Sequence, residues 1–139
     1  MHTERHGRRR FLTLLAGVAG ALVLGARPIP AVLRAGRGGH PEPRPGIDGS
    51  KVLKGEQVPA ELAELYDRIR RAAHVVDGIR CQCDCADVEG FYSLLTCYED
   101  SGMALHCNEC QDVGELVTRM HAEGRTLKEI RAAVDRHFG

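Results

Sequence analysis

All six cysteines of the 139-residue chain lie within 30 residues, and this clustering constrains the fold more than any other feature. Aromatic residues make up only 4% of the chain and tryptophan is absent. We therefore expect the cysteines, rather than a large aromatic core, to hold a small domain together. They form a Cys-x-Cys-x-Cys run, a single cysteine and a Cys-x-x-Cys pair: Cys81, Cys83, Cys85, Cys97, Cys107 and Cys110.

One role for these cysteines is to bind a soft metal ion. Thiolates select ions such as Cu(I) and Zn(II), and a Cys-x-x-Cys pair is a common half of a tetrahedral site. A straight Cys-x-Cys strand holds its sulfurs too far apart for one ion, so the chain must curl at Gln82 and Asp84. Met103 and His106 are further candidate ligands near the pair. The spacing predicts a metal site that uses the thiolates of all six cysteines.

Thiol redox chemistry is an alternative. Cys107 and Cys110 flank Asn108, the predicted N-cap of a helix, where free N–H groups and the helix dipole favour a thiolate. Cys107 would attack a disulfide and Cys110 would resolve it, or the 81–85 cluster would exchange electrons with the pair. The sequence has no βαβ pattern and no proline after Pro59, which argues against a thioredoxin-type enzyme.

Structural disulfides in an interaction module are the third reading. Bridges between Cys81 and Cys83 or between Cys83 and Cys85 are disfavoured, because alternate residues of a strand lie at the upper limit of disulfide geometry. Longer pairings stay open. No Ser-His-Asp arrangement, phosphate loop or paired carboxylates are present, so the thiol oxidoreductase is the enzyme alternative to a non-enzymatic metal-binding protein.

The cysteine pattern resembles the exported bacterial proteins and lipoproteins named for a PCYCGC or CYCXC motif. Here Arg80, Gln82 and Asp84 replace proline, tyrosine and glycine, and the lipid-modified cysteine is missing. Some relatives carry selenocysteine in this motif, so the resemblance implies thiol redox chemistry or soft-metal binding. The matching stretches are Arg80-Cys81-Gln82-Cys83-Asp84-Cys85, Gly90-x-x-Ser93-Leu94-x-x-Cys97-Tyr98, Cys107-x-x-Cys110 and Gly124-Arg125-Thr126-Leu127-Lys128-Glu129-Ile130-Arg131.

Residues 1–26 read as an export signal. Arg8-Arg9-x-Phe11-Leu12 resembles the twin-arginine motif, and the apolar run that follows is too short for a comfortable membrane span. A general secretory signal and a retained anchor are the alternatives. We expect export to the periplasm or the extracellular space, with membrane contact only through this segment. The expected partners are the twin-arginine export machinery and a periplasmic metal donor or acceptor, or a dithiol protein.

Charge divides the remainder of the chain. Residues 27–55 are rich in proline and glycine and carry six Lys/Arg against two Asp/Glu, which predicts a basic, solvated linker. Residues 56–139 carry nine Lys/Arg against sixteen Asp/Glu. Such an acidic domain disfavours nucleic acid as a partner and attracts cations.

Apolar periodicity predicts an all-α domain over residues 56–139. The first helix is expected over about 59–76, with Pro59 in its first turn and Gly78 as a left-handed cap. The fold class is therefore a small bundle of about three helices, with a Cys-rich loop segment between helix 1 and helix 2.

The second helix is expected to begin at Asn108, with a capping box to Gln111, and to close at Gly124. A capping box from Thr126 to Glu129 opens the last helix. The isolated histidines are expected at the surface: His74, His121 and His137.

Overall fold

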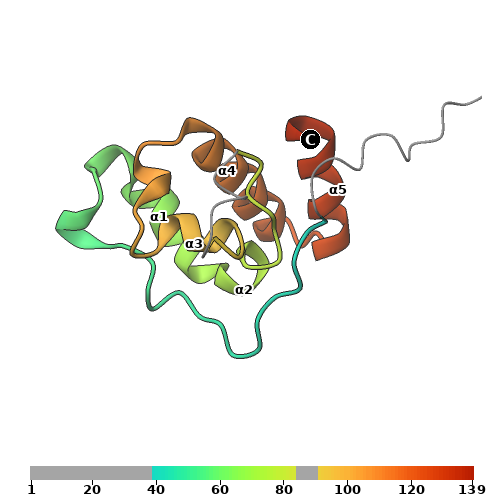
Figure 1. Cartoon of the computed structure of the whole chain (residues 1–139), viewed down its shortest axis with the longest axis horizontal. Helices are drawn as coiled ribbons and strands as arrows, with labels where there is room; N and C mark the ends of the chain where they lie inside the picture. The colour runs from blue at the N-terminus through green and yellow to red at the C-terminus, as the bar shows by residue number, and fades with distance from the viewer. Residues whose placement is uncertain (1–38, 84–90) are drawn as a thin grey trace, which may run out of the picture. The chain divides into compact units, whose positions relative to one another are not determined.

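The computed structural model describes residues 39–83 and 91–139, and its helices are shown in Figure 1. Within these ranges the chain is all-helical and contains no strand, so the predicted fold class is confirmed. The predicted signal segment lies outside the described residues. The helices are α1 (Ala63–Arg71), α2 (Ala73–Val76), α3 (Leu94–Tyr98), α4 (Asn108–Ala122) and α5 (Leu127–Phe138), with short 3-10 turns at Gly55–Gln57, Ala60–Leu62 and Met103–Leu105.

Helix α4 is the centre of the domain and contacts each of the other four helices. Its apolar stripe of Val113, Leu116 and Val117 is buried. Ile69 of α1 and Ile130 of α5 belong to the same core. The short helix α3 therefore lies against the helix that contacts all the others. This packing fixes the position of α3, which carries Cys97, relative to α4, which carries Cys110.

The prediction of one continuous first helix is wrong. The backbone leaves helical geometry at Ala72, with φ −104° and ψ 18°, and divides the segment into α1 and α2. The break allows Val75 as well as Val76 to be buried, although they do not share one face of a straight helix.

Gly78 is also not a left-handed cap, because it is not among the described glycines with positive φ. A Cβ atom there would lie 2.9 Å from Leu127 Cδ2 and 3.0 Å from Pro43 Cγ. Glycine at this position therefore lets the side chains of Leu127 and Pro43 pack closely against the backbone.

The described part of the basic segment lies along the helices rather than in solvent. Arg44 forms an ion pair with the buried carboxylate of Asp77, with 2.6 Å between Nη2 and Oδ1. The backbone N–H of Leu53 donates to the carbonyl of Tyr98 at 3.1 Å, and the side chain of Val52 is buried. Residues 39–55 therefore form part of the folded domain, in contrast to the tether that composition predicts.

The end of α4 and the start of α5 agree with the sequence. Gly124 has φ +77°, and the N–H of Arg125 after it closes on the carbonyl of Met120 at 3.0 Å. Thr126 and Glu129 form the predicted capping box. None of the helices within the described ranges combines the length and the apolar character that a membrane crossing requires.

Candidate metal centre

Three sulfur atoms from two separate segments meet inside the domain. The Sγ atoms of Cys81 and Cys83 are 3.1 Å apart, and those of Cys81 and Cys110 are 3.4 Å apart. The third side of the triangle, from Cys83 to Cys110, measures 3.6 Å. Because 29 residues separate Cys81 from Cys110, only the tertiary fold can bring these groups together.

The predicted curl of the Cys-x-Cys segment is confirmed at Gln82. An extended strand would hold the side chains of Cys81 and Cys83 far apart, whereas their sulfurs are in contact. Gln82 itself is buried, with 5% of its surface exposed, which holds the curl inside the domain. The second predicted curl, at Asp84, and the candidate ligand Cys85 lie outside the described residues.

The edges of the sulfur triangle are a few tenths of an ångström shorter than the S–S distance of about 3.8 Å in a tetrahedron with Zn–S bonds of about 2.3 Å. A small expansion would therefore let the three sulfurs ligate one ion, and a tetrahedral ion would take a fourth ligand as well. Cys81, Cys83 and Cys110 are thus a group that could hold a metal ion.

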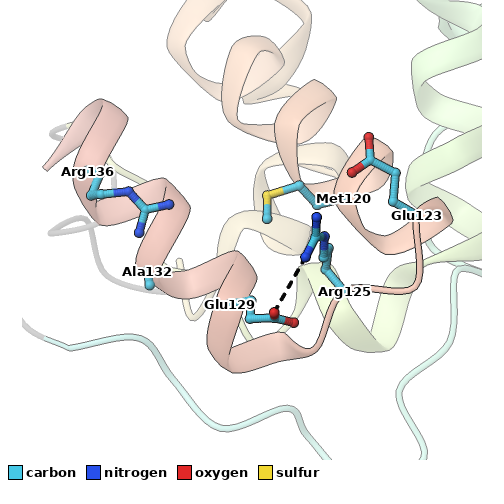
Figure 2. A pocket seen from close by; sticks show the side chains of 6 residues that line it. All are labelled: Met120, Glu123, Arg125, Glu129, Ala132 and Arg136. Carbon is cyan, nitrogen blue, oxygen red and sulfur yellow. Dashed lines mark ion pairs between the residues drawn. The ribbon is translucent and has the colours of Figure 1, made fainter.

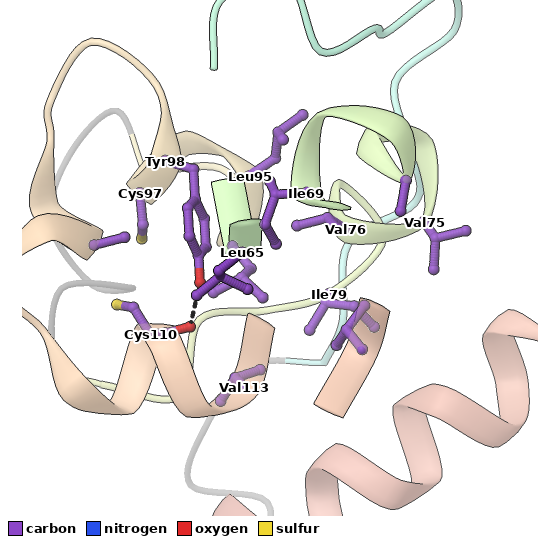
Figure 3. Packing of buried hydrophobic residues seen from close by; sticks show 14 of the residues in the cluster. Leu65, Ile69, Val75, Val76, Ile79, Leu95, Cys97, Tyr98, Cys110 and Val113 are labelled. Atoms are coloured by element: carbon purple, nitrogen blue, oxygen red, sulfur yellow. Dashed lines mark hydrogen bonds between the residues drawn. The ribbon is translucent and has the colours of Figure 1, made fainter. Parts of the chain in front are cut away.

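Cys97, on α3, adds a fourth thiol next to this group. Its side chain is fully buried, and it exchanges hydrogen bonds with the thiols of Cys81 and Cys110. Figure 3 shows Cys97 and Cys110 on the same side of the Tyr98 ring. The structure therefore brings four of the six predicted cysteine ligands into one cluster: Cys81, Cys83, Cys97 and Cys110.

The thiols of this cluster differ in acidity because one of them receives hydrogen bonds from the others. Hydrogen bonds from Cys110 and Cys97 lower the pKa of Cys81 to about 3, against the effect of burial. Donating to Cys81 is the main cause that raises the pKa of Cys110. For Cys97, the hydrogen bond with Cys110 lowers the pKa, but the bond with Cys81 and burial together raise it overall. The cluster thus favours one thiolate stabilised by neighbouring thiols.

Cys107 is the N-cap of α4, in place of the predicted Asn108. Its backbone is extended, and its Sγ accepts the N–H of Cys110 at 3.3 Å. The predicted capping box is also wrong, because the side chain of Gln111 donates to the carbonyl of Ala104 at 2.8 Å. Cys107 is half-buried, and its thiol hydrogen-bonds with that of Cys110. It borders the three-sulfur group without belonging to it.

The other candidate ligands lie at the surface. Met103 is 37% exposed and His106 is exposed, and neither belongs to the three-sulfur group. His74 is exposed and His121 is half-buried, and the two rings contact each other edge to face, with 5.5 Å between ring centroids.

The oxidation state differs among the described cysteines. Cys83 takes part in a disulfide, so it can act as a metal ligand only after reduction. Cys107 and Cys110 are free thiols. The fold therefore holds one such thiol in the triangle, at Cys110, and another beside it, at Cys107.

Three residues that support the cluster were missed by sequence reasoning. The hydroxyl of Tyr98 donates to the carbonyl of Cys110 at 2.7 Å, as Figure 3 shows, and Gly114 leaves room for that hydroxyl. Tyr66 stacks edge to face on Tyr98, and its buried hydroxyl has no partner among the described residues. Burial, with Cys110 and Cys97 nearby, raises the pKa of Tyr66 to about 12. Gly114, a glycine in the interior of a predicted helix, is the one sequence signal that could have indicated this close packing with Tyr98.

A surface hollow of about 350 Å³ between α4 and α5 lies apart from the cysteines (Figure 2). Arg125 and Glu129 form an ion pair there, with 3.7 Å between Nη1 and Oε1. No cysteine lines this hollow, and its charged side chains offer oxygen and nitrogen atoms rather than the soft thiol sulfurs of the cluster. The residues that line it are Met120, Glu123, Arg125, Glu129, Ala132 and Arg136.

Comparison of the chain with family models, curated proteins and solved structures finds no match. The resemblance to the PCYCGC family therefore stays a prediction, and the geometry of the cysteines carries the functional argument.

Proposed function

We propose that this chain is a soft-metal-binding protein whose site is built on Cys81, Cys83 and Cys110. The observation that carries the proposal is the triangle of sulfurs, 3.1 to 3.6 Å on a side, from two distant segments. Cysteines are often buried as small apolar side chains, and that would account for one or two of them. Convergence of three sulfurs at the spacing of a coordination polyhedron favours a metal site.

Cys97 is the proposed fourth ligand. Its thiol hydrogen-bonds with two of the three sulfurs, those of Cys81 and Cys110, whereas Cys107 caps α4 and hydrogen-bonds with Cys110. A fourth thiolate would complete a tetrahedral set of sulfur ligands for Zn(II). A tetrahedral Zn(II) site and a trigonal Cu(I) site would each require the three sulfurs to move apart by a few tenths of an ångström. Zn(II) and Cu(I) are therefore the two candidate ions.

The proposed role is metal handling, delivery or storage outside the cytoplasm. This part of the proposal rests on the twin-arginine-like signal, because that route exports proteins already folded. Replacing Arg8 and Arg9 together by lysine should block export of the full chain, measured by cell fractionation. Export of the double variant at the normal level would contradict the twin-arginine assignment.

The metal site is tested with the full chain, kept reduced and free of oxygen, so that the Cys83 thiol is available. Co(II) is titrated as a spectroscopic probe, because thiolate-to-cobalt charge transfer and tetrahedral ligand-field bands report the ligand set. Competition with Zn(II) then gives the affinity, and elemental analysis gives the stoichiometry. About one ion per chain is expected.

Variants separate ligands from bystanders. Cys110→Ser and Cys97→Ser should each weaken binding by tenfold or more and reduce the charge-transfer intensity, because each removes one thiolate. Asn108→Ser is the matched control, since it introduces a hydroxyl in the first turn of α4 and keeps every cysteine. Absence of tetrahedral Co(II) bands in the reduced wild type would refute the proposal.

A thiol oxidoreductase is the second candidate, favoured by the half-buried Cys107 beside the buried Cys110. The Cys107 thiolate would attack oxidised glutathione, forming a mixed disulfide and releasing one glutathione thiolate. Cys110 would then attack the Cys107 sulfur, forming the protein disulfide and releasing the second thiolate. Cys110→Ser should trap the mixed disulfide, detected by mass spectrometry, and no trapped species would exclude this candidate.

A further inference from the structure

We infer that Cys107 is an exchange ligand: it takes the metal ion from an outside donor and passes it to the buried cluster, without being one of its final ligands. The inference rests on the proposed metal-binding function. It concerns how the ion reaches a site whose Cys81, Cys97 and Cys110 side chains are buried.

The position of Cys107 suits an exchange ligand. Of the two described cysteines outside the triangle, Cys97 is buried and Cys107 is half-buried. Cys83 also reaches the surface, but its sulfur is already part of the triangle. An exchange ligand must hold the ion while the donor's ligands leave, so it has to lie outside the final site and be accessible.

Cys107 is also in direct contact with the cluster. The Sγ of Cys107 accepts the N–H of Cys110, and the two thiols hydrogen-bond with each other. The Cys-x-x-Cys spacing lets both sulfurs bind one ion. Cys110 then belongs to two overlapping groups, a surface pair with Cys107 and the buried triangle with Cys81 and Cys83.

The transfer is a series of ligand exchanges with no change of oxidation state. A bond from Cys107 sulfur to Zn(II) forms as one donor–Zn(II) bond breaks, and the Cys107 proton goes to water. Cys110 then replaces a second donor ligand in the same way. Bonds to Cys81 and the other cluster sulfurs form as the remaining donor bonds and the Cys107 bond break. The protons of the cluster thiols go to water, and Cys107 regains a proton from water.

This role has a kinetic signature that a final ligand does not have. An exchange ligand lowers the barrier in both directions, so its removal slows binding and release by the same factor and leaves their ratio unchanged. Loss of a final ligand weakens the equilibrium affinity. Serine suits the test because it is a good N-cap, so Cys107→Ser removes the sulfur and keeps a cap on α4.

The experiment uses the full chain under anaerobic conditions with a non-coordinating phosphine, which prevents disulfide chemistry from contributing. Zn(II) release to an excess of a chromophoric chelator and Zn(II) uptake from a weak chelator complex are followed by stopped flow. In Cys107→Ser both rates should fall about tenfold, which corresponds to a barrier change of about 1.4 kcal/mol. The dissociation constant should stay within about twofold of wild type.

Two variants make the result interpretable. Asn108→Ser should keep wild-type rates, and Cys107→Asn, a second substitution with an N-cap side chain, should reproduce the slow exchange of Cys107→Ser. Unchanged rates in Cys107→Ser would overturn the inference and leave the metal site standing. Faster release with weaker affinity would also overturn it, because Cys107 would then be a final ligand. A wild-type chain that binds no Zn(II) would remove the proposed function itself.

Discussion

Replacing Gly114 by alanine should disturb the packing that supports the cysteine cluster. A Cβ atom at this position would overlap the hydroxyl oxygen of Tyr98 and lie 3.0 Å from its Cζ atom. It would also lie 3.2 Å from Cδ1 of Ile69. Because the Tyr98 hydroxyl donates to the carbonyl of Cys110 at 2.7 Å, the tyrosine can relieve the overlap only by giving up this hydrogen bond.

The magnitude follows from three contributions. Overpacking a tight interior costs about 1–3 kcal/mol, and loss of the Tyr98 hydrogen bond costs about 1 kcal/mol. Alanine is favoured over glycine inside a helix by about 1 kcal/mol, which offsets part of this cost. The free energy of unfolding should therefore fall by about 1–3 kcal/mol. A glycine to alanine change in a helix normally acts in the opposite direction, so the sign is diagnostic.

The assay is urea unfolding of the reduced, metal-free chain, followed by circular dichroism. Tyr98→Phe removes the overlapping oxygen, so Gly114→Ala should cost about 1–2 kcal/mol less in that background than in wild type. Asp112→Ala, on the exposed side of α4, is the control and should change stability by less than about 0.5 kcal/mol. Additive effects of Gly114→Ala and Tyr98→Phe would refute the reasoning.

Three further predictions concern charge and metal. Burial would raise the pKa of Asp77, but hydrogen bonds from Arg44 and Ser93 outweigh it and hold this pKa below its usual range, so the carboxylate stabilises the fold above about pH 4 and loses that effect as pH falls. Asp77→Asn should therefore cost about 2 kcal/mol at pH 7 in urea unfolding and clearly less at pH 3. Burial raises the pKa of Glu99, so its ionised form opposes folding. Glu99→Gln should therefore raise the midpoint of thermal unfolding at pH 7, and an equal rise at pH 4 would contradict this cause. Zn(II) at 100 times its dissociation constant should stabilise the reduced chain by about 2.7 kcal/mol, and a chelator should abolish the gain; an unchanged melting curve would argue against the site.

Helix periodicity predicted the class of fold and both ends of the α4–α5 turn, because these depend on local interactions. The capping box of Thr126 with Glu129 needs only residues three apart, and Gly124 supplies its own left-handed turn. The break at Ala72 depends on the burial of Val75, and burial is a property of the whole domain. For the same reason, local sequence patterns could not predict the ion pair between Asp77 and Arg44, which are 33 residues apart in the chain.

The candidate site was predictable in composition but not in arrangement. Cysteine spacing predicted candidate ligands, of which Cys81, Cys83 and Cys110 come together, and it predicted the curl at Gln82, since thiolate geometry does not allow an extended Cys-x-Cys to hold one ion. Spacing could not show that Cys97 joins the group while Cys107 caps α4, because that difference depends on how α3 packs on α4. Neither Tyr98 nor Gly114 carries metal chemistry of its own, so only the packing reveals that they position Cys110.

The arrangement of the cluster implies that binding of the proposed metal ion would be coupled to folding. Helix α3 has five residues, and so short a helix is not stable without tertiary contacts. Its Cys97 contacts sulfurs from both the segment before it and the helix after it, so one ion would tie three parts of the chain at a single point. Hydrogen exchange of the metal-free and Zn(II)-loaded chain should therefore differ most at α3 and the first turn of α4. Equal protection of α3 in both states would mean that apolar packing alone orders the site.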